Sequence, residues 1–151
     1  MGHTVFAHFM DNDLFKLERF VDAQAATYER ARAELAAGRK RSHWMWFIFP
    51  QIRGLGSSAM AERYAISQLD EARAYLEHAI LGPRLRECTE LVNAVEGRTL
   101  EEIFGYPDDL KFQSSMTLFA EAEEARGVFA EALDRYAAGR RDAATLERVR
   151  L

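Results

Sequence analysis

Residues 43–51, His-Trp-Met-Trp-Phe-Ile-Phe-Pro-Gln, constrain the fold of this chain more than any other stretch. The run holds both tryptophans, and residues 44–50 are an unbroken series of apolar side chains. A membrane-spanning helix needs about 20 apolar residues, so this run is too short to be one. Its length suits a buried strand or a buried turn of helix, and periodicity does not separate these two structures in so short a run. We expect residues 44–49 to be buried and to anchor the core.

The rest of the composition is that of an ordinary globular protein. A chain of 151 residues with 48% hydrophobic and 29% charged residues predicts about one domain. Its net charge of −4 argues against general binding of nucleic acid or of a membrane surface. Residues 1–12 lack the features of a signal peptide, so we expect a frayed N-terminal arm, a single domain over residues 13–151, and a cytoplasmic location. Cys88, the only cysteine, is expected to be a small buried hydrophobe.

Apolar residues recur at steps of three and four along most of the chain, which is the spacing of amphipathic helices. A helix is predicted to begin at Leu14 after Asp13 and to end at Gly38, either as one helix or as two that divide near Thr27. Two further starts have the pattern of a capping box, Ser67 with Asp70 and Thr99 with Glu102. No pair of alternating runs is joined by a hairpin turn, so we predict a compact all-α domain of about six to eight short helices.

Several kinds of catalytic and cofactor site have no counterpart in the sequence. There is no phosphate-binding loop of Walker type, no zinc-binding His-Glu-x-x-His motif and no nucleophile elbow. The four histidines are scattered along the chain, and the single cysteine excludes cysteine-based metal sites. We therefore expect no metal site and no cofactor.

Polar side chains surround the aromatic run and are the first candidate site. His43 is the natural proton carrier near neutral pH, and Trp44 or Trp46 has the flat surface on which a planar ligand can stack. Arg53 or Arg41 is suited to pair with an anionic group, and Gln51 is suited to hydrogen-bond a ligand. The alternative is that the aromatic residues fill the core while His43 and Gln51 only satisfy backbone groups.

A second polar block lies within an otherwise apolar helical pattern. It contains Asp109, Lys111, Ser114 and Ser115, between apolar positions that include Phe112. Serine side chains in the middle of a helix compete with the backbone for hydrogen bonds, so a better helix former is expected unless the hydroxyls have a role. A buried polar site is one interpretation, and a solvated helix face is the other.

Long blocks of the sequence resemble a bacterial and fungal family that is numbered 1810 among domains of unknown function. The resemblance extends from about residue 14 to residue 146, and it rests on residues 43–51, 54–56, 64–66, 71–76, 81–85, 103–105, 108–109 and 111–119. It implies an all-α fold and no established activity. Members are sometimes labelled calpastatin, but calpastatin-type inhibitors are disordered polar segments, whereas this chain has the apolar content of a packed domain. The blocks after Ser42 and around Lys111 also resemble, loosely, the all-α family that processes ADP-ribose derivatives.

Two functions therefore compete. In the first, both polar blocks face one pocket that binds or processes a small anionic, nucleotide-like ligand of the ADP-ribose type. His43 or Asp109 would then be the acid or base, Lys111 and Arg53 would pair with the anion, and Trp44 would stack on the ligand. Gln51, Ser114 and Ser115 would complete the ligand contacts. In the second, the protein is a non-enzymatic interaction or structural module without a ligand pocket.

Overall fold

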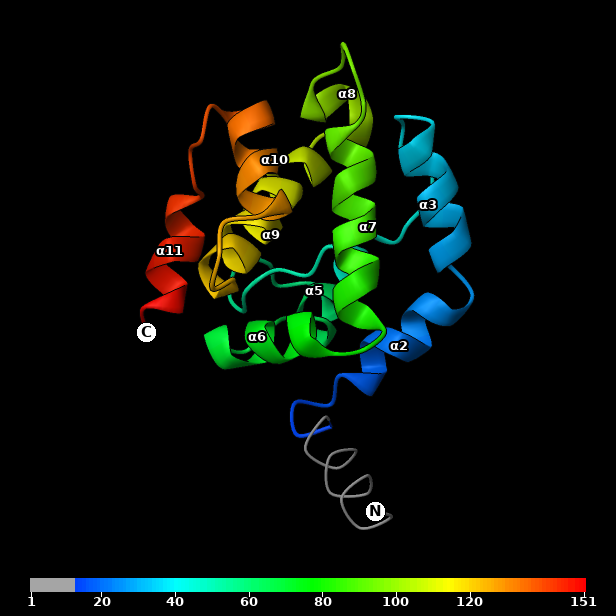
Figure 1. Ribbon diagram of the computed structural model, residues 1–151. Coiled ribbons are helices and arrows are strands. Elements are labelled where there is room, and N and C mark those ends of the chain that lie inside the picture. Colours follow the sequence, from blue (N-terminus) through cyan, green and yellow to red (C-terminus); the bar gives the residue numbers. More distant parts are fainter. Residues whose placement is uncertain (1–12) are drawn as a thin grey trace.

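The computed structural model describes residues 13–151, and Figure 1 shows them as an arrangement of short helices. The helices of this range are α2 (Glu18–Ala25), α3 (Tyr28–Ala36), α4 (Met45–Ile48), α5 (Ala59–Arg63), α6 (Leu69–Glu77), α7 (Leu81–Asn93), α8 (Leu100–Phe104), α9 (Asp108–Ala122), α10 (Val128–Ala137) and α11 (Ala143–Val149). The described residues contain no strand beyond one isolated parallel bridge between Ile52 and Ile66. The all-α prediction is confirmed. The expected number of helices was too small, because residues 13–151 form ten, three of which have only four or five residues. The arm predicted for residues 1–12 lies outside the described residues.

The N-terminal helical region differs from the prediction at both its start and its middle. Lys16 has a φ of 56°, in the left-handed region that side-chain-bearing residues rarely adopt. A helix that begins at Leu14 is therefore interrupted, and α2 begins only at Glu18. Near Thr27 the chain divides into α2 and α3, which decides between the two alternatives that the sequence left open.

One of the two predicted capping boxes forms. Thr99 accepts a hydrogen bond from the backbone of Glu102, and the Glu102 carboxylate accepts one from the backbone of Thr99 at 2.8 Å. The other prediction was wrong. Ser67 donates its hydroxyl and its N–H to the Glu71 carboxylate instead of forming a box with Asp70, and α6 begins one residue later than such a box requires.

The longest helices hold the core together. Helix α7 packs against α3, α6 and α10, and α9 packs against α6, α8, α10 and α11. In Figure 1, α7 stands between α3 and the α9–α10 pair, and α6 crosses below them. One cluster of buried apolar side chains connects these helices from Leu17 to Leu133, and Cys88 is part of it, as predicted. Its centre is aromatic, with the Phe112 ring 4.8 Å from Phe104 and 5.0 Å from Phe49 between centroids.

The aromatic run forms one turn of helix followed by extended chain. Helix α4 covers Met45–Ile48, and Phe49 leaves the helix with a φ of −125° and a ψ of 76°. A residue that precedes proline is disfavoured in the α conformation, which explains why the helix ends before Pro50. Burial of the run is confirmed, since Trp44 is fully buried and Trp46 is partly buried. Residues 45–48 are helical and no residue of the run belongs to a strand, so the strand alternative is excluded.

Candidate functional site

Trp44 is fixed inside the protein by the carboxylate of Glu34. Its indole N–H donates to Glu34 at 2.9 Å, and the same carboxylate accepts hydrogen bonds from the Ser42 hydroxyl and from the backbone of Arg41. Burial by itself raises the pKa of Glu34, but these hydrogen bonds outweigh it and lower the pKa to about 2. Glu34 is therefore ionised at neutral pH, and it holds Trp44 in the core, where a ligand does not reach it.

Residues next to the two predicted polar blocks form ion pairs at the start of α9. Asp108 pairs with Lys40 at 2.8 Å and with Lys111 at 3.5 Å. Lys40 also lies 5.1 Å from the centre of the Trp44 ring, which joins this ion pair to the aromatic run. An acidic residue in the first turn of a helix is stabilised by the helix dipole. The segment before α4 and the first turn of α9 are therefore neighbours in space.

A cavity of about 510 Å³ opens beside this junction, and we call it the Trp46 cavity. Its wall includes Trp46 and Gln51 from the aromatic run, and Lys111 and Ser114 from α9. The ammonium group of Lys111 lies 5.5 Å from the centre of the Trp46 ring. A cation at this distance from an indole is attracted to the ring face. The structure thus brings three of the predicted ligand-binding residues, Gln51, Lys111 and Ser114, to one cavity.

The remaining predicted residues lie elsewhere. His43 is exposed and Trp44 is in the core, and neither lines the Trp46 cavity. Asp109 and Ser115 also lie outside its lining; each has a buried oxygen that finds no hydrogen-bond partner among residues 13–151. Arg53 lines a different cavity. A ligand bound at Lys111 in the Trp46 cavity would therefore not contact the predicted acid–base residues, His43 and Asp109.

The sequence did not indicate that the C-terminal segment contributes to the site. Asp142 and Ala144, beside and within α11, line the Trp46 cavity, as do residues of the 55–58 turn. The backbone N–H of Asp142 donates to the Thr117 hydroxyl at 2.9 Å, which attaches the start of α11 to α9. The only local signal was that Asp142 is a good N-cap residue, and its carboxylate does accept from Thr145. That signal predicts a helix start and says nothing about its neighbours.

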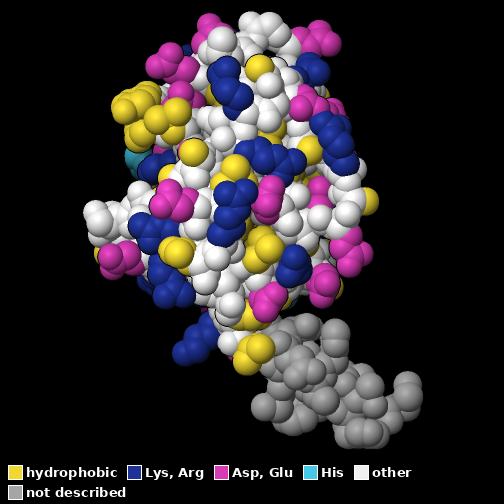
Figure 2. All heavy atoms as spheres, turned by 90° about the vertical axis from the view of Figure 1, so that its left-hand side faces the viewer, with side chains coloured by type: hydrophobic (Ala, Val, Ile, Leu, Met, Phe, Trp, Pro, Cys, Tyr) yellow, Lys and Arg dark blue, Asp and Glu magenta, His cyan; other side chains and the backbone are white. Residues whose placement is uncertain are grey.

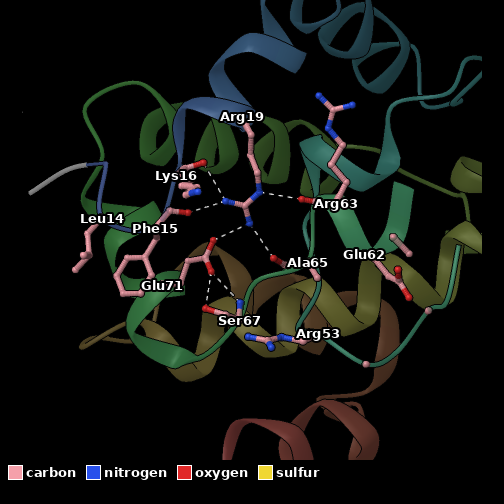
Figure 3. A pocket seen from close by; sticks show the side chains of 13 residues that line it. Leu14, Phe15, Lys16, Arg19, Arg53, Glu62, Arg63, Ala65, Ser67 and Glu71 are labelled. Carbon is pink, nitrogen blue, oxygen red and sulfur yellow. Dashed lines mark hydrogen bonds and ion pairs between the residues drawn. The ribbon is translucent and has the colours of Figure 1, made fainter. Parts of the chain in front are cut away.

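A second cavity of about 550 Å³, here called the Arg53 cavity, lies on the other side of the residue 54–56 turn. Figure 3 shows Arg19 and Glu71 in its middle, with Arg63 on one side and Arg53 on the other. Arg19 pairs with Glu71 at 2.9 Å and donates to four backbone carbonyls, those of Phe15, Lys16, Arg63 and Ala65. A guanidinium group has five N–H donors. Arg19 is therefore saturated, and its role is to join the start of α2 to the segment after α5.

Within residues 13–151, no group of three His, Cys, Asp or Glu side chains is arranged to hold a metal ion. Burial raises the pKa of the Cys88 thiol to about 12, so the reactive thiolate is scarce at neutral pH. None of the helices described combines the length and the hydropathy that crossing a bilayer requires.

The comparison with protein families identifies the chain. A family model described as "Protein of unknown function (DUF1810)" matches residues 14–149. The chain belongs to the DUF1810 family. Among solved structures, the conserved hypothetical protein Rv1873 from Mycobacterium tuberculosis is 59% identical, with a TM-score of 0.89 over 91% of this chain and 98% of that one. No curated protein matches the sequence.

The DUF1810 match covers both cavities. Residues 14–149 include the aromatic run, the 54–58 turn, α9 and the start of α11, which together form the Trp46 cavity. Figure 2 shows the face on the α11 side, where basic and acidic side chains are interspersed over the surface. Mixed charge of this kind lacks the continuous basic surface that binds an extended polyanion such as a nucleic acid.

Proposed function

We propose that the Trp46 cavity of this DUF1810 protein binds a small anionic ligand with a flat, nucleotide-like group. The single observation that carries the proposal is the placement of the Lys111 ammonium 5.5 Å from the Trp46 ring centre, at the wall of a cavity of about 510 Å³. Ligand sites typically have volumes of about 300–1,000 Å³ and combine an aromatic surface with a few polar groups. In this proposal Trp46 takes the stacking role that the sequence had suggested for Trp44.

The charges beside the cavity favour an anion. One carboxylate, Asp108, lies between two ammonium groups, and it is closer to Lys40 at 2.8 Å than to Lys111 at 3.5 Å. Lys111 is therefore only partly neutralised. Asp142 also lines the cavity and keeps its negative charge, but its carboxylate is held at the start of α11 by two hydrogen bonds from Thr145. The negative charge of an anionic ligand would complete the neutralisation of Lys111.

Polar groups in the wall would orient the ligand. The side-chain amide of Gln51 makes no hydrogen bond with another residue of the 13–151 range, so its donor and acceptor are both available. Ser114 donates to the carbonyl of Leu110 at 3.1 Å and retains an acceptor. A nucleotide-like molecule, with a planar base and anionic phosphate, matches this set. The loose resemblance to proteins that process ADP-ribose derivatives makes ADP-ribose one of the first ligands to test.

The proposal is one of binding and assigns no reaction. Neither His43 nor Asp109 lines the Trp46 cavity, so neither is placed to transfer a proton to a ligand held there.

A thermal-shift screen tests the proposal directly. The panel is AMP, ADP, ADP-ribose, NAD and nicotinamide mononucleotide, each confirmed by isothermal titration calorimetry. At 100 times its Kd, a ligand stabilises the folded state by about 2.7 kcal/mol, so binding raises Tm measurably. We expect Lys111→Ala to abolish the rise, and Arg30→Ala, an exposed α3 residue that removes the same charge, to preserve it.

Two outcomes would contradict the proposal. One is that no compound of the panel raises the Tm of the wild-type protein. The other is that Lys111→Ala keeps the full rise, which would place the ligand elsewhere. In either case the interaction-module function, the alternative that the sequence left open, would be preferred.

A further inference from the structure

The Arg53 cavity has a rigid wall that is already electrically balanced. Arg19 and Glu71 neutralise each other at 2.9 Å, and all five donors of Arg19 are engaged. The second carboxylate oxygen of Glu71 accepts from the hydroxyl and the backbone of Ser67. Figure 3 shows this network crossing the cavity. Because this pair needs no further partner, the charge that remains in the cavity comes from the other charged side chains that line it, which are three cations and one carboxylate: Lys16, Arg53, Arg63 and Glu62.

Arg53 supplies an exposed guanidinium group on a fixed backbone. The backbone N–H of Arg53 donates to the carbonyl of Ile66 at 2.8 Å, and the backbone N–H of Ile66 donates to the carbonyl of Gln51 at 2.8 Å. These two bonds form the parallel bridge of Ile52 and Ile66, beside Ala65 and Ser67 in the cavity wall. The Arg53 side chain makes no ion pair within residues 13–151.

A second guanidinium group comes from α11 and lies against Gly54. A Cβ atom at Gly54 would lie only 2.5 Å from the Nη1 atom of Arg148, and Gly54 has a φ of +97°. The backbone conformation favours glycine here, and the Arg148 guanidinium occupies the space that a side chain at this position would take. Arg148 also makes no ion pair within the described part of the chain. Arg148 is not itself a lining residue of the Arg53 cavity, but its guanidinium group lies against Gly54, which does line the cavity next to Arg53.

Arg63 is less suited to a ligand than Arg53. Its guanidinium carbon lies 5.4 Å from the centre of the Tyr64 ring. It also borders an adjacent hollow that contains Asp13, Glu18 and Asp22, whose carboxylates offset its charge. Replacement of Arg63 should therefore weaken anion binding less than replacement of Arg53, although both residues line the same cavity.

We infer that the Arg53 cavity is a second anion site, which takes the phosphate groups of a small molecule through Arg53 and Arg148. Like charges that gather around one hollow repel each other, and an anion between them removes this repulsion. The planar fork of arginine donors matches phosphate oxygens, which makes phosphate the favoured class of ligand. The site shares only Gly56 and Ala61 with the lining of the Trp46 cavity, so it does not depend on the function proposed above.

Calorimetric titration with inorganic pyrophosphate tests the inference. We expect saturable binding to the wild-type chain, and a loss of affinity of about tenfold or more in Arg53→Ala and in Arg148→Ala, because each removes a charge-assisted hydrogen bond. Arg63→Ala should lose less. Arg30→Ala, which removes the same charge outside both cavities, should bind as the wild type does.

Two further variants keep the result decisive. Arg53→Gln and Arg148→Gln keep a polar side chain with hydrogen-bond donors but remove the charge, and both should lose affinity with an unchanged Tm in the absence of ligand. Lys111→Ala should retain pyrophosphate binding, since Lys111 lies in the other cavity. Absence of binding in the wild type, equal affinity in the Arg53 and Arg30 variants, or loss of binding in Lys111→Ala would each overturn the inference.

Discussion

Trp44 and Trp46 are two residues apart in the sequence and have opposite surroundings. Trp44 is fully buried, and its indole N–H is bound to the ionised Glu34. Trp46 is partly buried and lines a cavity opposite Lys111. Trp44 is the N-cap of α4 and has a non-helical φ of −142°, whereas Trp46 lies inside the helix. The α4 turn and its N-cap thus supply both a core anchor and a wall of the proposed ligand site.

This difference shows that a hydrophobic run does not have one role throughout. Its apolar character decides that the run is buried, whereas the geometry of a single turn decides which side chain meets solvent. The same contrast recurs on α9. Lys111 and Ser114 line the Trp46 cavity, while Ser115 is fully buried.

The largest effect is expected from the two tryptophans themselves. Trp44→Ala should lower the free energy of unfolding by about 3–5 kcal/mol, because it empties a fully buried site. It also leaves Glu34 without one of its hydrogen-bond donors. Trp46→Ala should cost about half as much or less, since part of its surface is already exposed. Urea denaturation of both variants measures the difference, and equal losses would contradict the assignment of separate roles.

Glu34 provides the next largest effect. Glu34→Gln keeps the size of the side chain but removes the charge that accepts from Ser42, Arg41 and Trp44, and should cost about 1–3 kcal/mol. The measurement is the urea midpoint at neutral pH, with Glu29→Gln on the exposed face of α3 as the control. A Glu34 variant as stable as this control would show that the carboxylate does not hold Trp44.

The pH dependence of this contact has a definite sign. The pKa of Glu34 is about 2 in the folded protein, below its ordinary value of 4.5. A depressed pKa stabilises the folded state above the unfolded pKa, and this stabilisation is lost as the pH falls. The wild type should therefore lose more stability than Glu34→Gln between about pH 4.5 and pH 2. Parallel stability profiles of the two proteins across this range would refute the contribution of Glu34.

Ser115 and Thr117 offer a smaller contrast within α9. Ser115 has a buried hydroxyl without a partner among residues 13–151, so Ser115→Ala should raise the free energy of unfolding by about 0.5–1 kcal/mol. Thr117 donates to Gln113 and accepts from Asp142, so Thr117→Ala should lower it by about 1 kcal/mol. Opposite signs in thermal denaturation are expected. Destabilisation by Ser115→Ala would indicate that its hydroxyl has a partner.

Sequence periodicity predicted the class of fold well, for a reason that the helices make plain. Spacing of apolar residues reports which face of a helix is buried, and this determined the all-α class and the burial of Cys88. It did not report the left-handed Lys16 or the single turn of α4, because both depend on contacts with distant segments. The short helices α5 and α8 are likewise too brief to show a period.

The candidate site could be predicted only in part. Residue chemistry indicated Gln51, Lys111 and Ser114, all of which line the Trp46 cavity. It could not separate Trp44 from Trp46, since a short run does not reveal which face turns inward. Nor could it place Arg148 against Gly54, or Arg53 in a different cavity from Lys111, because that requires the path of the chain between residue 53 and α11. Tertiary arrangement, rather than residue type, decides these positions.

The smallest effect on stability is expected at Lys111, although its replacement should have a large effect on ligand binding. This contrast distinguishes a ligand-facing residue from a core residue such as Trp44. The ion pair of Lys111 with Asp108 is long at 3.5 Å and partly exposed, so Lys111→Ala should change the free energy of unfolding by less than about 0.5 kcal/mol. Urea denaturation checks this expectation. A loss comparable with that of Trp44→Ala would make Lys111 a core residue and remove the contrast between structural and ligand-facing roles.

Tryptophan fluorescence of two single-tryptophan variants tests the central claim most directly. Trp44→Phe leaves Trp46 as the only tryptophan, and Trp46→Phe leaves Trp44. Each variant is titrated with acrylamide and then with the nucleotide that gives the largest thermal shift. Separate roles predict that Trp46 is quenched readily by acrylamide and that its emission changes saturably with the nucleotide, while Trp44 resists both. Equal quenching of the two tryptophans, or a nucleotide response from Trp44 alone, would contradict the division of the run into a core anchor and a ligand-facing wall.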